Sequence, residues 1–232
     1  MMIVCIPNVL SPDSLGKLRA LLSRSAFGDG AATAGWHART VKNNEQADPL
    51  DPFAREAGDI ALAALEANEV FRAAVLPRRL RAPLLSRTTP GRTYGTHVDD
   101  AVMGGGAPSD PRGEAPLRAD IAVTLFLSDP DGYEGGELVI ETTAGEMAVR
   151  LAAGEAVAYP AGTLHRVAPV TSGERLVAAT WAQSLVRDPA AREILFDLDT
   201  ARRDLFAREG KSRAFDLLAK SRAALLRRWA EP

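Results

Sequence analysis

The region from residue 79 to residue 186 consists of short β-type segments separated by turn residues, with no helical pattern between them. Dipeptides such as Asp131-Gly132 and Ser172-Gly173 mark the turns. Strands this short and closely spaced predict a sandwich or jelly roll, because each must pair with neighbours and bury one face. The expected strands span residues 79–88, 94–99, 118–127, 136–142, 146–151, 155–159, 164–169 and 174–184.

Helical patterns flank this β region on both sides. Ser11 and Pro12 provide an N-cap and a proline at the first helical position, so we expect a helix from there to about residue 24. Three more helices are expected, over residues 53–76 with a break near Asn68, over 189–209 and over 212–229. In the remaining N-terminal part we expect a short strand over 2–6, a hairpin or irregular strand pair over 27–40, and a turn over the polar run 41–46.

These elements predict a mainly β protein with flanking helices. Residues 1–186 form one domain with its β core at about 79–186, and residues 187–232 form a C-terminal helical extension. We expect the helices to brace one sheet of the roll. An apolar stripe on the C-terminal helices would then offer a contact for a homodimer.

Composition excludes several classes of partner. The chain has 232 residues, 46% of them hydrophobic, which is enough for one sizeable core. A net charge of −2 gives no reason to expect nucleic acid or an anionic membrane as partner. The longest apolar-rich run, 121–127, is far too short to span a bilayer, and the N-terminus lacks the features of a signal peptide. With Cys5 as the only cysteine, we expect a cytoplasmic protein without disulfides.

Two histidines and one aspartate have the order of a metal ligand set. His97 and Asp99 lie two positions apart on an extended segment, so their side chains point to the same side, and His165 follows on a distant strand. Two imidazoles and one carboxylate, without any thiolate, are typical of non-haem iron(II) oxygenases, which leave positions open for a co-substrate and O2.

Arg175 follows the second histidine on an apolar segment that we interpret as a strand. A guanidinium on a rigid strand grips a carboxylate in a bidentate manner, which suits the distal carboxylate of 2-oxoglutarate. Together the four residues indicate an iron(II)- and 2-oxoglutarate-dependent dioxygenase. Trp181 lies on the same strand face as Arg175 and either walls the co-substrate pocket or packs in the core. Tyr94 has the same two interpretations.

Other interpretations of these residues remain open. A zinc hydrolase uses similar ligands, but the HExxH signature of a helical zinc site is absent. A non-catalytic jelly-roll sensor of iron or 2-oxoglutarate, acting through a protein partner, is the alternative of a different class. His37 is interpreted as structural or exposed, and Asn43 and Asn44 as an ordinary turn, with orientation of a substrate as their alternative role. The Gly- and Pro-rich segment 100–116 is expected to lack strand and helix, and to be either a lid over the metal or a disordered connection.

Longer motifs along nearly the whole chain resemble one family, the bacterial PKHD-type hydroxylases, which are related to prolyl and lysyl hydroxylases and are associated with iron uptake. The motifs are Ile6-Pro-Asn-Val-Leu-Ser11, Val41-Lys-Asn-Asn44, Tyr94-Gly-Thr-His97-Val-Asp99, Thr124-Leu-Phe-Leu-Ser-Asp-Pro130, Tyr133-Glu-Gly-Gly-Glu-Leu-Val139, Pro169-Val-Thr-Ser-Gly-Glu-Arg175 and Trp181-Ala-Gln-Ser-Leu-Val-Arg-Asp188.

This resemblance implies a double-stranded β-helix core, iron ligation by His97, Asp99 and His165, and 2-oxoglutarate binding by Arg175. It also implies hydroxylation of a substrate with decarboxylation of 2-oxoglutarate to succinate, and a response to ascorbate. The substrate, a small molecule or a peptide, is not identified. Relatives commonly carry a tyrosine near the start of the strand that leads to the first ligand, whereas this chain has Thr88 there.

Overall fold

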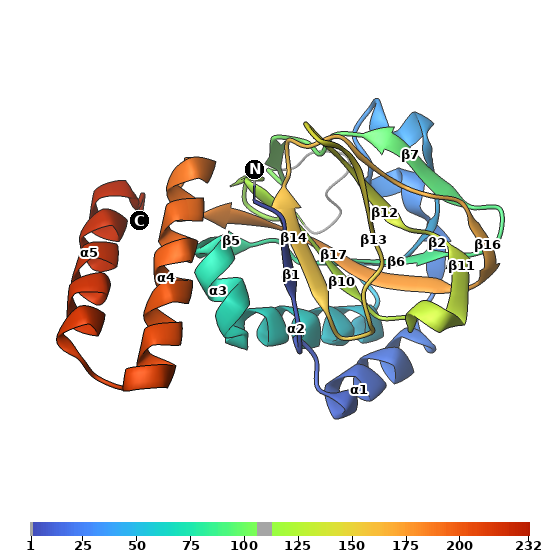
Figure 1. Ribbon diagram of the computed structural model, residues 1–232. Coiled ribbons are helices and arrows are strands. Elements are labelled where there is room, and N and C mark those ends of the chain that lie inside the picture. The colour runs from blue at the N-terminus through green and yellow to red at the C-terminus, as the bar shows by residue number, and fades with distance from the viewer. Residues whose placement is uncertain (1, 106–112) are drawn as a thin grey trace.

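The computed structural model describes residues 2–105 and 113–232. Its centre is a pair of facing β-sheets, with helices below one sheet and two C-terminal helices at one end (Figure 1). This arrangement confirms the predicted mainly β architecture with flanking helices, and the two facing sheets form a jelly roll. Among the described residues, no helix is long and apolar enough to cross a membrane.

The larger sheet joins strands from both ends of the chain. Within the described residues its strands follow the order β1-β14-β10-β17-β6-β4-β2, and β5 also pairs with β17. All of the pairings are antiparallel. The strand bounds are β1 Val4–Ile6, β2 Phe27–Asp29, β4 Glu45–Ala47, β5 Pro77–Leu80, β6 Leu84–Thr88, β10 Ile121–Phe126, β14 Ala156–Pro160 and β17 Arg175–Ser184.

The smaller sheet has the order β13-β12-β15-β7-β3. Its strands are β3 Lys42–Asn43, β7 Thr93–His97, β12 Leu138–Thr142, β13 Gly145–Val149 and β15 His165–Val167. Two short ribbons complete the strand pairing, one from β8 Val102–Met103 with β9 Leu117–Arg118, the other from β11 Tyr133–Gly135 with β16 Val170–Gly173. A 3-10 turn, η3 Pro130–Gly132, precedes β11.

Apolar side chains fill the space between the sheets. Phe126 and Val177 of the larger sheet pack with Leu138 and Ile140 of the smaller one in a single buried cluster. On the other face of the larger sheet, a second buried cluster holds α1 (Pro12–Leu22), α2 (Pro52–Ala67) and α3 (Glu69–Val75) against β10 and β14. Because β10 is covered on both faces, all of its residues are buried and its sequence shows no alternation.

The N-terminal helices begin and end where the capping signals predict. The Ser11 hydroxyl accepts a hydrogen bond from the Ser14 N–H at the start of α1. Asn68 separates α2 from α3, and its side chain accepts from the Phe71 N–H. The break predicted near Asn68 is therefore the N-cap of a new helix.

The C-terminal helices, α4 Pro189–Glu209 and α5 Arg213–Trp229, have the predicted extents. We expected the helices to brace one sheet of the roll, but this pair does not. Instead, α4 packs on α3 and α5 packs on α4. Asp199 of α4 forms ion pairs with Arg203, at 2.6 Å, and with Arg222 of α5, at 3.0 Å. The exposed apolar residues of this pair are Ile194, Phe206 and Leu217, and the homodimer remains a prediction.

Three expectations for irregular segments were wrong. Residues 27–40 do not pair internally, because β2 pairs with β4 and the 3-10 turns η1 Gly30–Thr33 and η2 Ala38–Thr40 fill the interval. The polar run 41–46 forms β3 and the start of β4 instead of a turn, since its alternate side chains face a polar cavity. In segment 100–116, β8 forms a strand by pairing with β9, and residues 106–112 lie outside the described residues.

Candidate metal centre and co-substrate pocket

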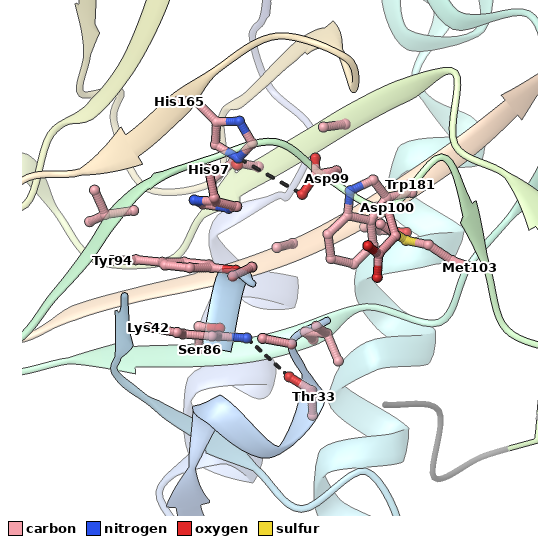
Figure 2. Close-up of a pocket in the computed structure, with 18 of the residues that line it drawn as sticks. Thr33, Lys42, Ser86, Tyr94, His97, Asp99, Asp100, Met103, His165 and Trp181 are labelled. Carbon is pink, nitrogen blue, oxygen red and sulfur yellow. Dashed lines mark hydrogen bonds and ion pairs between the residues drawn. The ribbon is translucent and has the colours of Figure 1, made fainter. Parts of the chain in front are cut away.

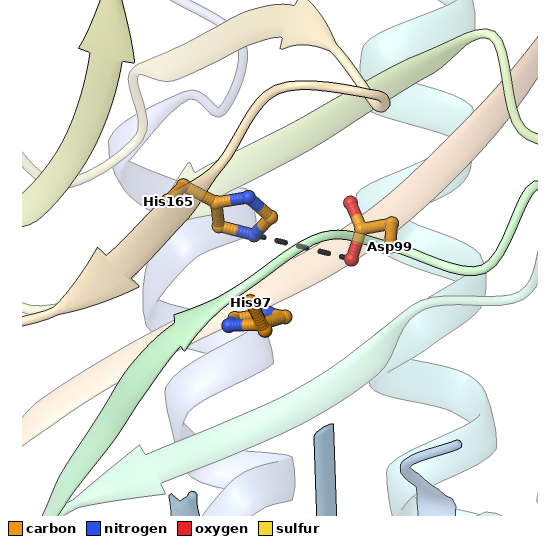
Figure 3. Close-up of side chains that lie close together, drawn as sticks. All are labelled: His97, Asp99 and His165. Atoms are coloured by element: carbon orange, nitrogen blue, oxygen red, sulfur yellow. Dashed lines mark ion pairs between the residues drawn. The ribbon is translucent and has the colours of Figure 1, made fainter. Parts of the chain in front are cut away.

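The three predicted metal ligands meet in a cavity between the sheets (Figure 3). His97 ends β7, His165 begins β15, and the two residues are direct partners in the antiparallel register of these strands. Asp99 follows two positions after β7 and returns its carboxylate towards them. One ligand atom from each side chain lies within 4.8 Å of the others, so a single ion can contact all three.

Backbone carbonyls orient both imidazole rings. The Nδ1 of His97 lies 2.8 Å from the Gly95 carbonyl oxygen, and the Nδ1 of His165 lies 2.9 Å from the Thr163 carbonyl oxygen. A carbonyl only accepts hydrogen bonds, so each Nδ1 carries the proton and each Nε2 keeps its lone pair. A hydrogen bond from Nδ1 to a backbone carbonyl is the usual way in which a protein orients a histidine ring so that its Nε2 can bind a metal.

Burial makes Asp99 a carboxylate that needs a cation. Its side chain is 6% exposed, and burial raises its pKa, an effect that His165 and the indole of Trp181 oppose. Oδ1 lies 3.9 Å from Nε2 of His165, while Oδ2 has no hydrogen-bond partner among the described residues. A divalent ion would supply the missing partner, so the site fits the iron that its donor set indicates.

His97 is neutral at physiological pH because burial lowers its pKa to about 3. Its ring stacks on Tyr94, with centroids 3.7 Å apart and planes 13° from parallel, and its centroid lies 4.3 Å from that of His165. Tyr94 therefore lines the cavity and fixes the plane of a metal ligand in the same contact. The sequence left both of its interpretations open.

Arg175 is a buried guanidinium that faces the same cavity. It is 3% exposed, and no carboxylate among the described residues forms an ion pair with it. Burial lowers its pKa, an effect that Tyr133 and Tyr159 oppose, and its Nε lacks a hydrogen-bond partner. A buried cation in this state requires an anionic ligand. Trp181 lies further along β17 and lines the cavity as well.

A polar wall of the cavity was missed in the sequence. It consists of Thr33, Lys42, Gln46 and Ser86, of which Figure 2 labels Thr33, Lys42 and Ser86. The Lys42 ammonium donates to the Thr33 hydroxyl at 3.0 Å, and the Gln46 amide donates to the Ser86 hydroxyl at 3.2 Å. Burial lowers the pKa of Lys42 to about 8, although Asp99 and Asp29 oppose this. Residues 42, 44 and 46 are buried while 41 and 43 are exposed, but residues 42–46 are polar on both faces of the strand, so the sequence carried no alternating signal.

Tyr159 is a second residue that the sequence did not single out. It is buried on β14, lines the cavity, and its ring meets the edge of His165 at a centroid distance of 5.2 Å. Its pKa is raised well above the usual value by burial. Thr88 lies opposite Arg175 in the register of β6 and β17 and is buried, but the residues that line the cavity do not include it.

The remaining candidates lie at the rim. Met103 of β8 and Asp100 line the cavity beside the predicted ligands, whereas the middle of the predicted lid 100–116, residues 106–112, lies outside the described residues. His37 lies outside the metal cluster and contacts Trp36 edge-on at 5.3 Å. Its structural interpretation is consistent with this position.

Comparison with known proteins identifies the family. Residues 83–183 match the model of the 2OG-Fe(II) oxygenase superfamily. A PKHD-type hydroxylase of Synechococcus elongatus is 51% identical over 99% of this chain and 100% of its own length, and one of Rippkaea orientalis is 49% identical over the same shares. The chain belongs to the PKHD-type hydroxylase family. The resemblance seen in the motifs is thereby confirmed, and membership in this family makes the protein an iron(II)- and 2-oxoglutarate-dependent oxygenase.

Solved structures share the fold of this PKHD-type hydroxylase at low sequence identity. The viral collagen prolyl hydroxylase of Paramecium Bursaria Chlorella virus-1, in complex with 2-oxoglutarate, has a TM-score of 0.52 and 18% identity over 79% of this chain and 96% of its own. HygX from Streptomyces hygroscopicus, with nickel and 2-oxoglutarate bound, has a TM-score of 0.52 and 15% identity over 79% of this chain and 84% of its own. These neighbours confirm the jelly-roll core.

Proposed function

We propose that His97, Asp99 and His165 hold the ferrous ion of this oxygenase and that Arg175 holds the distal carboxylate of 2-oxoglutarate. One observation carries the proposal: a single cavity contains a three-residue metal cluster and a buried guanidinium that lacks a carboxylate partner among the described residues. The site thus offers both of the attachments that the co-substrate requires.

The ion, when bound, would supply open coordination positions for 2-oxoglutarate and O2 and would pass to O2 the electrons that come from 2-oxoglutarate and the substrate C–H bond. The protein's own residues prepare the site for this chemistry. The carbonyls of Gly95 and Thr163 keep the Nε2 atoms of both histidines free of protons. Tyr94 prevents the His97 ring from turning, and Trp181 places an indole against Asp99. Preorganised ligands need no rearrangement before the reaction.

Arg175 orients the co-substrate and restricts which other acids can bind in its place. A planar guanidinium forms two parallel hydrogen bonds with a carboxylate, which fixes both its position and its plane. The buried phenols of Tyr133 and Tyr159 lie beside Arg175 and keep bulk water away from it. A dry, cationic end of the cavity selects a dicarboxylate whose second acidic group can reach the metal.

The overall reaction consumes one O2, one 2-oxoglutarate and one substrate C–H bond. It yields succinate, CO2 and a hydroxylated product, with one oxygen atom in succinate and the other in the product. The catalysed step is therefore a hydroxylation, and Asp100 and Met103 line the cavity beside the three proposed ligands.

The decisive experiment measures 2-oxoglutarate turnover by the purified protein loaded with Fe(II), with isotopically labelled O2 and mass detection of products that gain one oxygen. We expect steady succinate formation and label in both succinate and product. A protein that binds iron and 2-oxoglutarate but forms no succinate under any condition would instead be the non-catalytic sensor. The His37→Ala variant is the control and should form succinate like the wild type, because His37 lies outside the metal cluster.

Two further expectations follow from the family resemblance, and a third follows from the composition. We propose that ascorbate sustains turnover by returning oxidised iron to the ferrous state, which succinate formation with and without ascorbate tests. We also propose a role in iron homeostasis and a cytoplasmic location, where the exposed Cys5 stays reduced. Expression of the gene under iron limitation and fractionation of cells test these two points.

A further inference from the structure

The proposed function gives no task to the buried ammonium of Lys42. Lys42 lines the same cavity as the metal ligands and is 8% exposed. It comes from β3, at the edge of the smaller sheet, where it is the register partner of Tyr94. Its ammonium lies 5.2 Å from the centroid of the Tyr94 ring, whose other face stacks on His97. Lys42 therefore lies one aromatic ring away from the metal centre.

The electrostatic state of Lys42 calls for an anion. Among the described residues it forms no ion pair within 4 Å, and its recorded hydrogen bond goes to the neutral Thr33 hydroxyl. An ammonium group has three donors, so Lys42 keeps N–H groups that have no charged acceptor among the described residues. Asp99 and Asp29 act on it only from a distance, and a bound metal ion would take up the charge of Asp99. A buried charge in this state is costly until a ligand neutralises it.

The co-substrate does not supply that anion. 2-Oxoglutarate has two carboxylates, of which one accompanies its keto group on the metal and the other pairs with Arg175 in the proposed function. Arg175 and Lys42 lie on different sheets, on β17 and β3. With both carboxylates in use, the partner of Lys42 has to come from the second organic substrate.

The sequence positions of most of the wall residues also indicate that the wall binds the primary substrate. The model of the oxygenase superfamily matches residues 83–183, which contain the metal ligands and Arg175. Thr33, Lys42 and Gln46 come from the N-terminal part, outside this shared region. Residues that many oxygenases share carry the common chemistry, whereas a wall built from elsewhere is suited to selecting the substrate.

We infer that Lys42 binds a carboxylate of the primary substrate and holds the substrate's C–H bond towards the metal. The inference rests on the proposed function. A planar monoanion suits this wall, because the wall offers one ammonium, while the Thr33 hydroxyl and the Gln46 amide beside it are hydrogen-bonded to each other and Gln46 also donates to Ser86. Phosphate groups are usually bound by several arginines or a nest of backbone N–H groups, which this wall lacks among its described residues.

The test compares carboxylic acids with their primary amides, both as free small molecules and as glutamyl and glutaminyl peptides. Binding of each matched pair is measured by ligand-observed NMR on protein loaded with Mn(II) and saturating 2-oxoglutarate, so that Arg175 is occupied. The variants are Lys42→Met, which keeps length without charge, Lys42→Arg, which restores charge, and Lys17→Met, an exposed control on α1. Unchanged 2-oxoglutarate affinity in Lys42→Met establishes that its pocket is intact.

We expect the wild type to prefer acids over amides, and Lys42→Met to lose about 10- to 100-fold in affinity for the acids alone. Lys42→Arg should recover part of this loss, and Lys17→Met should match the wild type. Preference for free acids or for glutamyl peptides distinguishes the two sources of the carboxylate. The inference is overturned if the wild type binds acids and amides equally. It is also overturned if Lys42→Met prefers acids over amides as strongly as the wild type does.

Turnover separates this inference from the proposed function. In one outcome, the wild type and Lys42→Met both turn over 2-oxoglutarate steadily and oxidise acids and amides equally. This outcome supports the proposed function and shows that Lys42 does not bind the substrate. Acid binding that depends on Lys42, in a protein that never forms succinate, supports the inference and contradicts the enzymatic proposal.

Discussion

His97 and His165 are direct register partners on two antiparallel strands, and each ring hydrogen-bonds through Nδ1 to the carbonyl two residues earlier in the chain. The same local contact therefore sets the tautomer of both ligands. Because the proton is held at Nδ1 in each ring, both Nε2 lone pairs are available to one ion, and Asp99 completes the set.

We expect His97→Ala, Asp99→Ala and His165→Ala to fold but to lose more than roughly 100-fold in Fe(II) affinity and all 2-oxoglutarate turnover. Two remaining protein ligands do not hold a labile ferrous ion in an open geometry. Metal content after dialysis and succinate formation measure the effect, with His37→Ala as the matched control. Wild-type iron content in all three variants would show that the metal binds elsewhere.

Arg175→Lys should raise the Michaelis constant for 2-oxoglutarate, and Arg175→Ala should raise it further. Lysine keeps the charge but loses the planar fork, and alanine loses a charge-assisted contact worth about 2–3 kcal/mol, or roughly 30- to 150-fold in affinity. Titration of 2-oxoglutarate into the iron-loaded variants measures this. Arg208→Ala, on the exposed side of α4, is the control. An unchanged affinity in Arg175→Ala would remove this residue from co-substrate binding.

Trp181→Phe should weaken Fe(II) binding by about tenfold while leaving the ligand set complete. The indole of Trp181 opposes the rise in the pKa of the Asp99 carboxyl, and partners that orient a ligand typically contribute this much to metal affinity. Competition with a metal-binding dye gives the affinity. Trp36→Phe is the control because Trp36 is 82% exposed. If both phenylalanine variants bind iron equally well, the indole N–H has no part in the metal site.

The metal-free protein should become more stable from pH 8 to pH 10.5 through Lys42. Burial lowers the pKa of Lys42 to about 8 in the folded state, from 10.5 in the unfolded state. Below pH 8 the folded protein bears the full cost of the buried charge. Between the two values the unfolded chain binds more protons, so the free energy of unfolding rises with pH, by at most about 3 kcal/mol.

Urea unfolding of the wild type and Lys42→Met across this pH range measures the difference. Lys42→Met should be more stable than the wild type at pH 7, and the gap should close towards pH 10.5. Lys17→Met reports on the general titration of exposed lysines. Parallel pH curves for wild type and Lys42→Met would mean that Lys42 is not charged at a cost in the folded protein.

Local signals predicted much of the fold. Ser11, Asn68 and Asp188 cap helices where the sequence indicated, since a cap depends only on a few neighbouring residues. The direction in which the C-terminal helices pack was not predictable in this way. Their apolar faces show that they are buried against something, but the contact with α3 follows from the path of the whole chain.

The site was predictable only in part for the same reason. His97 and Asp99 are close in sequence, so their spacing alone placed them together. The run from residue 41 to residue 46 was misinterpreted because polar residues usually face solvent, whereas here they face a cavity that forms only when β3 joins the edge of the smaller sheet. A lysine that is buried beside a metal centre is invisible until the two sheets are assembled.

The proposed metal ligands and the proposed co-substrate anchor belong to different layers of the molecule. His97 and His165 lie on the smaller sheet and Arg175 on the larger one, with Phe126 and Ile140 packed between the layers. The span that 2-oxoglutarate must bridge is thus set by the thickness of this apolar filling. Because protein interiors transmit small changes of volume, a single deleted methyl group there would alter the reach from anchor to metal. The fit of the co-substrate is a property of side chains that never touch it.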